Sequence, residues 1–307
     1  MRKYNTFLSI FVLFIIINMI LSPSLYIQQT LNGLTAWALH VLPSVLPFMF
    51  FTKILTSLGS IESFSKIFKP VMYKLFKTPS ISSFVFLTSV VSGYPIGAKM
   101  TSDLYQSGKI SKVEAFRMCS FCSTSGPMFI VGAVGVGMLG NAANGYIILI
   151  SHILGALING LTYRNLKIKE KPDSNPSTHT SRQSKTDLSS MVLDSALSII
   201  SVGAIIAIFF VVITAISPLL SVFPQSITSV IEGIIEITKG CSSIALNFKS
   251  AWSVVACTFV ISFGGISTIL QSLTMLNKLN MPIKLFILQK FTHALFSTII
   301  SIIFVMI

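Results

Sequence analysis

The chain has 307 residues, of which 52% are hydrophobic and only 10% are charged, and its formal net charge is +13. Its mean hydropathy is +0.82. Soluble domains carry about a quarter charged residues, so this composition excludes an ordinary soluble protein and indicates one that crosses a lipid bilayer several times. The excess of Lys and Arg indicates basic cytoplasmic loops and no nucleic-acid partner, since no basic stripe with interleaved aromatic residues is present.

The N-terminal part predicts two crossing helices, at about 5–22 and 34–58. A basic start followed by an apolar run is typical of a signal peptide, but the run is long and no small-residue cleavage site follows it. We therefore expect the first helix to be retained. Pro43 and Pro47 are expected to kink the second helix, and 59–81 is a predicted loop rich in lysine.

The middle of the chain contains two interrupted apolar segments. Residues 82–107 carry two glycines, a proline and a lysine near their centre, and the predicted helix at 112–140 is broken by STSGP at 123–127. A further helix is expected at 143–163. The stretch 164–190 is polar and basic, which is typical of a mobile cytoplasmic linker.

After this linker we expect spans at about 194–222 and 283–307. Between them, 224–240 is predicted to be an amphipathic helix at the membrane interface, with two glutamates on its polar face. A third interrupted apolar segment covers about 250–277.

The distribution of lysine predicts how the chain crosses the membrane. With a cytoplasmic N-terminus, the Lys-rich segments 59–81 and 164–190 both fall in the cytoplasm if 82–107 and 250–277 enter the membrane and return to the same side. Broken helices at membrane depth are tolerated where they are buried in protein or line a cavity. The predicted fold is therefore an all-α polytopic membrane protein with about six transmembrane helices and two re-entrant helical hairpins. Both termini are expected in the cytoplasm and the protein in the plasma membrane.

The order of these elements predicts an inverted internal repeat. We match 38–57 with 196–215, and 92–104 with 262–274. The expected organisation is an N-terminal transmembrane helix and outer loop at 1–33, a first repeat at 34–140, a connecting transmembrane helix at 141–163, the basic linker at 164–190, and a second, inverted repeat at 191–307.

The helix breaks are the candidate binding site, because paired interrupted segments in inverted repeats mark the central site of many secondary transporters. Glycine and proline end the helices there, and freed backbone groups with Ser and Thr hydroxyls suit a polar or anionic ligand. For a single break, close helix packing is the simpler interpretation. The candidate substrate-binding residues are Gly93, Tyr94, Pro95, Gly97, Lys99, Ser123, Thr124, Ser125, Gly126, Gly264, Gly265 and Ser267.

Residues 92–141, from SGYPIGAKM to GMLGN, closely resemble the YlbJ-type sporulation integral membrane proteins. The segments EITKGCSSIAL (236–246) and ISFGGIS (261–267) match the second half of that family in order. The resemblance implies a nucleoside-recognition or Gate domain, related to concentrative nucleoside transporters and spore maturation proteins. It also implies a role in spore cortex formation and spore maturation, without a known substrate.

Other chemistry-bearing residues have structural explanations. The CxxC pair Cys119 and Cys122 lacks a second pair of ligands, so we expect packing residues and no metal site. His152 and His293 are more simply neutral, hydrogen-bonded packing residues than a proton relay, and Lys290 lies within the last helix.

Two functions remain open. No Walker loop, GxSxG elbow or HExxH helix is present, so we expect neither an enzyme nor a cofactor. One hypothesis is a transporter-like protein that binds or moves a small polar or anionic solute. The alternative is a non-transporting assembly protein that binds other sporulation membrane proteins. Mutation of the hairpin tips would distinguish the two.

Overall fold

The computed structural model describes residues 2–168 and 187–307, so most of the expected linker lies outside the described residues. Within these ranges every regular element is a helix. Five helical segments there are long and apolar enough to cross a membrane: Pro23–Leu55, Ala142–Tyr163, Leu188–Leu220, Ala251–Met275 and Ile283–Met306.

The N-terminal part is more helical than predicted. After α1 (Arg2–Leu21), one continuous run begins at Pro23, because proline is favoured at the first position of a helix. This run replaces the expected outer loop before residue 34. It consists of α2 (Pro23–Ala36), a π-helical turn η1 (Trp37–Val41) and α3 (Leu42–Ser57). The expected lysine-rich loop is also mostly helical, as α4 (Ser60–Val71) and η2 (Met72–Phe76).

The first hairpin forms where the sequence predicts it. α5 (Ser82–Ser92) ends at Gly93, whose φ of 76° is readily adopted only by glycine, and α6 (Ile96–Gln106) begins after Pro95. The next helix is broken, as expected, between α7 (Lys112–Cys119) and the π-helical η3 (Met128–Met138). A capping box starts α7, since Ser111 and Glu114 bond each other's backbone amides. The 22-residue α8 (Ala142–Tyr163) follows.

The second hairpin lies elsewhere than predicted. The expected interfacial helix at 224–240 is part of a helical hairpin, formed by α10 (Gln225–Ile235) and α11 (Ile237–Asn247), which pack along each other. Two glycines allow this close packing, because a Cβ at Gly240 would overlap the backbone of Gly233. Glu236 lies between the arms in an extended conformation.

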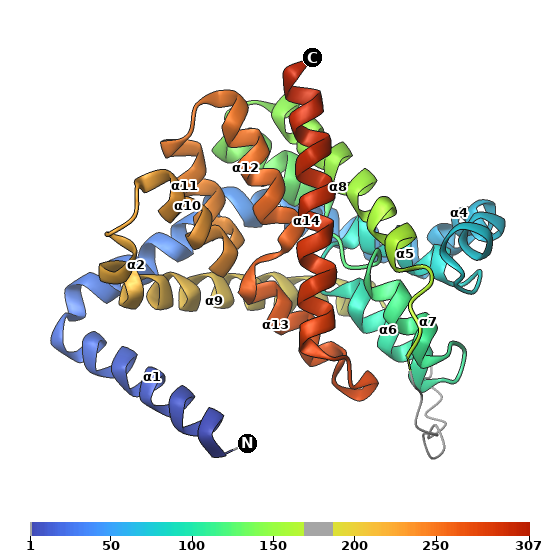
Figure 1. Ribbon diagram of the computed structural model, residues 1–307, viewed down its shortest axis with the longest axis horizontal. Coiled ribbons are helices and arrows are strands. Elements are labelled where there is room, and N and C mark those ends of the chain that lie inside the picture. The colour runs from blue at the N-terminus through green and yellow to red at the C-terminus, as the bar shows by residue number, and fades with distance from the viewer. Residues whose placement is uncertain (1, 169–186) are drawn as a thin grey trace.

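The segment 250–277 is consequently not a hairpin. α12 (Ser250–Phe263) and α13 (Gly265–Met275) continue in one general direction alongside α14 (Ile283–Met306), with a short 3₁₀ turn η4 (Asn277–Leu279) before that last helix (Figure 1). The break between them occurs at Gly264 and Gly265, where φ is 92° and 62°. The prediction mistook a broken helix for a hairpin because both contain glycines in an apolar run.

The two halves therefore repeat the same three parts, with a different pairing of breaks from the predicted one. Each half has a hairpin of two 11-residue arms, then a helix broken near its middle, then an uninterrupted helix of 22 or 24 residues. The tip at 93–95 corresponds to Glu236, and the break at 120–127 corresponds to Gly264.

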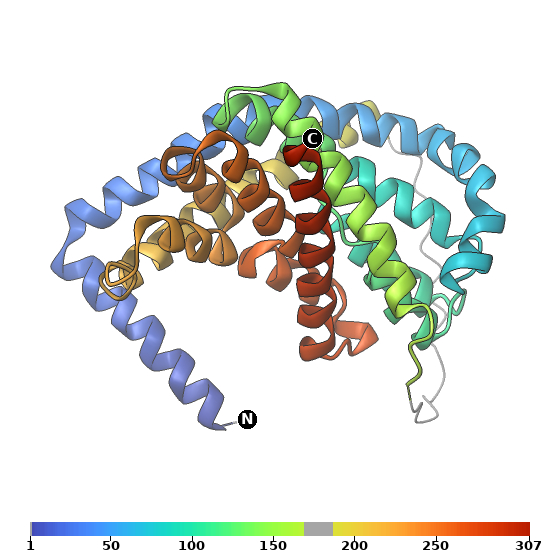
Figure 2. The same ribbon diagram turned by 45° about the horizontal axis from the view of Figure 1, so that its top comes forward.

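Packing places these repeated parts around a common centre. α14 packs against both α8 and α12, while the 33-residue α9 (Leu188–Leu220) runs across them and packs on α2 and α3 (Figures 1 and 2). The interior near the first hairpin is apolar, with Phe76, Phe116, Phe121 and Phe286 fully buried or nearly so. Burial of such side chains stabilises each by about 1.5–3 kcal/mol.

Candidate functional site

The helix breaks of both halves meet around one cavity of about 450 Å³. The first hairpin contributes its tip at 92–96, and the break after α7 contributes Ser125 and Gly126. The second hairpin contributes Glu236, Ile237 and Thr238. Residues from α13, α3 and α9 complete the wall.

Seven of the twelve predicted site residues line this cavity: Gly93, Tyr94, Pro95, Lys99, Ser125, Gly126 and Ser267. The other five lie beside it: Gly97, Ser123, Thr124, Gly264 and Gly265. The structure thus brings residues from the first hairpin tip and from both broken helices together. Seven of the predicted residues line the cavity, and the other five lie behind them.

The glycines have different structural tasks. At Gly93, a Cβ would lie 2.7 Å from the amide nitrogen of Gly126, so the hairpin tip touches the neighbouring break backbone to backbone. At Gly97 a Cβ would overlap the carbonyl oxygen of Cys122. Gly97 was expected to help the chain turn at the tip. It lies instead inside α6, and its absent side chain allows that helix to approach the break.

Side chains from three other helices bind the backbone of the 120–127 break. Asn159 Nδ2 donates to the carbonyl oxygen of Ser120 at 2.7 Å, and Ser89 Oγ donates to that of Cys122. Lys290 Nζ donates to the carbonyl oxygen of Ser123 at 2.8 Å. Three carbonyls of the break are thereby satisfied inside the protein, as irregular backbone at membrane depth requires.

Two amides of this break have partners inside the protein. The Thr124 N–H donates to Ser89 Oγ at 3.3 Å, and the Ser125 N–H donates to His152 Nε2 at 2.9 Å. Because Nε2 accepts, His152 carries its proton on Nδ1, which lies 2.8 Å from Ser262 Oγ. His293 Nε2 lies 2.9 Å from the carbonyl oxygen of His152. Both histidines are buried and hydrogen-bonded, as expected for packing residues.

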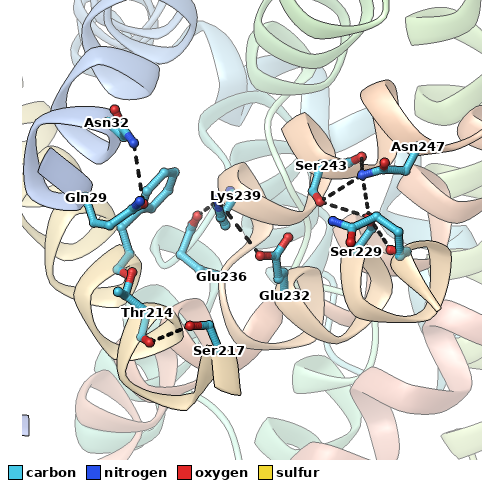
Figure 3. A network of polar contacts seen from close by, with 12 residues as sticks. Gln29, Asn32, Thr214, Ser217, Ser229, Glu232, Glu236, Lys239, Ser243 and Asn247 are labelled. Carbon is cyan, nitrogen blue, oxygen red and sulfur yellow. Dashed lines mark hydrogen bonds and ion pairs between the residues drawn. The ribbon is translucent and has the colours of Figure 1, made fainter. Parts of the chain in front are cut away.

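The acidic residue of the site, Glu236, is not among the residues predicted from the sequence. Glu236 is 3% exposed, lines the cavity, and accepts the Lys239 N–H at 2.7 Å as the N-cap of α11. Its neighbour Glu232 lies outside the cavity lining, with its carboxylate 3.9 Å from Lys239 Nζ (Figure 3). One sequence feature could have predicted a hairpin that turns at Glu236. Gly233 and Gly240 lie seven residues apart on either side of it, and paired small residues allow two helices to pack closely.

The cavity has a mostly apolar wall with a few convergent polar groups. Val41, Phe48, Met49, Phe129 and Ile205 supply apolar surface. The polar lining groups are Ser92, Tyr94, Lys99, Ser125, Ser198, Ser201, Glu236, Thr238, Ser267, Thr268, Gln271 and Thr274. Ser267 Oγ is buried and has no hydrogen-bond partner among the residues that the structure describes. Such a mixture is typical of a small-molecule site.

In the described part of the chain, no group of three His, Cys, Asp or Glu residues is placed to hold a metal ion. The four cysteines are buried and unbridged.

Two hairpins and two broken helices around a central cavity define a helical membrane protein with a transporter-like fold. The solved structure of a CNTnw double variant in an outward-facing state has the same fold, with a TM-score of 0.60 and 15% identity, covering 88% of this chain and 76% of that one. Residues 38–142 match the Gate family model, described as nucleoside recognition.

The chain is 28% identical to the sporulation integral membrane protein YlbJ of Bacillus subtilis (strain 168) over 336 residues, which cover 97% of this chain and 82% of YlbJ. The resemblance found in the sequence is thereby confirmed, both for the Gate domain and for a sporulation membrane protein.

Proposed function

We propose that the protein binds a small polar solute in the cavity between the two hairpin tips and moves it across the membrane. The observation that carries this proposal is that both hairpin tips, the first break and the start of α13 just after the second break line one cavity. Packing alone gives no reason for both hairpin tips and both breaks to converge on unfilled space, whereas a ligand site does.

The lining indicates the chemistry of the solute. Glu236 can accept hydrogen bonds from hydroxyl or amino groups, while Lys99 can donate to carbonyl, carboxylate or phosphate oxygens. The apolar wall suits a ring or a hydrocarbon face. The expected solute therefore carries both donors and acceptors on a compact, partly apolar frame.

A thermal-shift screen of the purified protein in detergent tests this proposal, with nucleosides and small dicarboxylates as the probes. A ligand at 100 times its dissociation constant stabilises the native state by about 2.7 kcal/mol, a clear rise in Tm. The variant Glu236→Gln is expected to weaken binding about 10- to 100-fold, because a hydrogen bond to a charged group contributes about 1.5–3 kcal/mol. Uptake of the ligand into liposomes then measures transport.

Glu232→Gln is the matched control, since Glu232 lies one turn earlier on the same hairpin and outside the lining. Equal loss of binding in both variants would contradict a site at Glu236. If no compound binds and the cavity variants keep full biological activity, the assembly role becomes the better explanation.

We also propose an orientation in the plasma membrane. Basic residues from four segments meet at one end of the molecule, where Arg117 donates to the Lys77 and Leu166 carbonyls and Arg164 donates to that of Lys74. Lys278 lies at the same end, where its Nζ donates to Gln106 Oε1. By the positive-inside rule, this end faces the cytoplasm.

This orientation differs from the predicted one at the C-terminus. The start of α14 lies at the basic end and residue 307 at the other, while the N-terminus lies toward the basic end (Figure 1). The expectation of two cytoplasmic termini depended on a hairpin at 250–277, and the structure contradicts that hairpin. In the proposed orientation Lys278 and Lys284 fall on the cytoplasmic side.

The likeness to YlbJ supports a role in sporulation, in which a solute is moved across a membrane of the sporulating cell. Deletion of the gene is expected to impair spore formation, and the Glu236→Gln variant to fail to restore it while Glu232→Gln restores it.

A further inference from the structure

Lys290 is a buried cation that the proposed solute site does not use. It lies in α14 and is 2% exposed, and it is outside the cavity lining. Its Nζ donates to Tyr94 Oη at 2.6 Å and to the Ser123 carbonyl oxygen at 2.8 Å. The same Nζ lies 4.4 Å from the centre of the Tyr94 ring.

No carboxylate among the described side chains lies within ion-pair distance of this nitrogen. The nearest ionisable groups are the tyrosine it contacts and the two histidines, His152 and His293, which are hydrogen-bonded elsewhere. A buried charge without an opposite charge is costly, so neutral donors are the usual partners of such a carbonyl. Two other carbonyls of the same break do have neutral donors. Asn159 donates to the Ser120 carbonyl and Ser89 donates to the Cys122 carbonyl.

The groups around Nζ would also attract a monovalent metal ion. A carbonyl freed by unwinding, a phenol oxygen and a tyrosine ring all present negative potential to a cation. They come from the first hairpin tip and the adjacent break, and unwound carbonyls of broken helices are where secondary transporters hold Na⁺. Gly264 leaves room for the lysine, since a Cβ there would lie 3.2 Å from Lys290 Cε.

We propose that Lys290 is a tethered cation that occupies a monovalent-cation site between the first hairpin tip and the 120–127 break. Lys290 Nζ links these two elements, and Tyr94 Oη extends the link to the Ile261 carbonyl at 3.4 Å. The protein therefore assembles its cavity without Na⁺ or K⁺. This inference does not depend on which solute the cavity binds.

Removal of the tether tests the proposal through the ion dependence of stability. The purified native protein is expected to have the same Tm in sodium chloride and in choline chloride of equal concentration. Lys290→Ser removes the ammonium and leaves the carbonyl and phenol oxygens available. This variant is expected to have a lower Tm in choline than the native protein. Sodium at 100 times its dissociation constant should raise that Tm by about 5–10 °C.

Lys99→Ser is the control, because Lys99 lines the cavity but is not bound to the break, and its Tm should not respond to sodium. Lys290→Ala is the second variant and should respond as Lys290→Ser does. A sodium-dependent Tm of the native protein would overturn the proposal. Equal Tm values of both Lys290 variants in the two salts, or failure of both to fold in sodium, would also overturn it.

Discussion

At the scale of single residues, the site depends on the absence of side chains as much as on their presence. Gly97 and Gly126 lie on facing segments of the same contact, but only one of them is sterically restricted. The first faces the Cys122 carbonyl, whereas a Cβ at Gly126 would find its nearest atoms at 3.5 Å, an ordinary contact distance. Glycines on the two sides of one contact therefore differ in how much an added methyl group would disturb the packing.

We predict that Gly97→Ala lowers the free energy of unfolding by about 1–3 kcal/mol, because α6 must move away from the break to admit the methyl group. Gly126→Ala is predicted to stay within about 0.5 kcal/mol of the native protein. Thermal unfolding in detergent measures both. Similar Tm values for the two variants would show that α6 can move away from the break at little cost.

The second prediction at the scale of single residues concerns Asn159. It is fully buried, and its amide donates to the Ser120 and Gln289 carbonyls at 2.7 and 2.9 Å. Asn159→Leu leaves the Ser120 carbonyl without this donor, at about 1–3 kcal/mol for a buried group, while the Gln289 carbonyl keeps the Thr292 hydroxyl at 3.2 Å. We expect a strongly lowered Tm, while Thr162→Ala, at an exposed position of the same helix, should change it little.

At the scale of elements, the second hairpin is defined by contact between its arms. Ser229 Oγ in α10 lies 2.8 Å from Ser243 Oγ in α11, and Asn247 joins them (Figure 3). Ser242, one residue earlier than Ser243, instead contacts Met138 of η3. An amphipathic helix lying alone at the interface would have none of these contacts.

We predict that the double variant Ser229→Cys with Ser243→Cys forms a disulfide on mild oxidation. Mass spectrometry of the alkylated protein counts the thiols that remain. The pair Ser229→Cys with Ser242→Cys should keep both thiols, because those side chains leave α10 and α11 in different directions. Equal oxidation of the two pairs would indicate a mobile segment in place of the hairpin.

At the scale of the whole molecule, the path of 250–275 decides which ends of the chain share a side of the membrane. If α12 and α13 cross, Lys249 and Lys284 lie on opposite sides; if they form a hairpin, both lie on one side. Both lysines are exposed, and the four natural cysteines are buried, so single cysteines at these positions report on the path.

We predict that Lys249→Cys reacts with an impermeant maleimide added outside intact cells. Lys284→Cys should react only after the membrane is opened, because it belongs to the basic end. Labelling of both residues from the same side would restore the originally predicted hairpin and overturn the proposed orientation.

The sequence by itself determined the class of protein, the first hairpin and the break at 123–127, because apolar runs, glycines and prolines are local signals that act within a few residues. It also supplied seven cavity-lining residues. It could not distinguish a hairpin from a broken helix at 250–277, since both need the same glycines in the same apolar run.

Only the tertiary structure decided that the second hairpin turns at Glu236 and that Lys290 binds the first break. The partners of Lys290 lie 167 and 196 residues away along the chain. A partner so distant leaves no local pattern, because the contact exists only once α14 has packed between α8 and α12. The positions of the breaks are thus determined locally, while the groups that bind their freed carbonyls and amides are determined by the packing of the two halves.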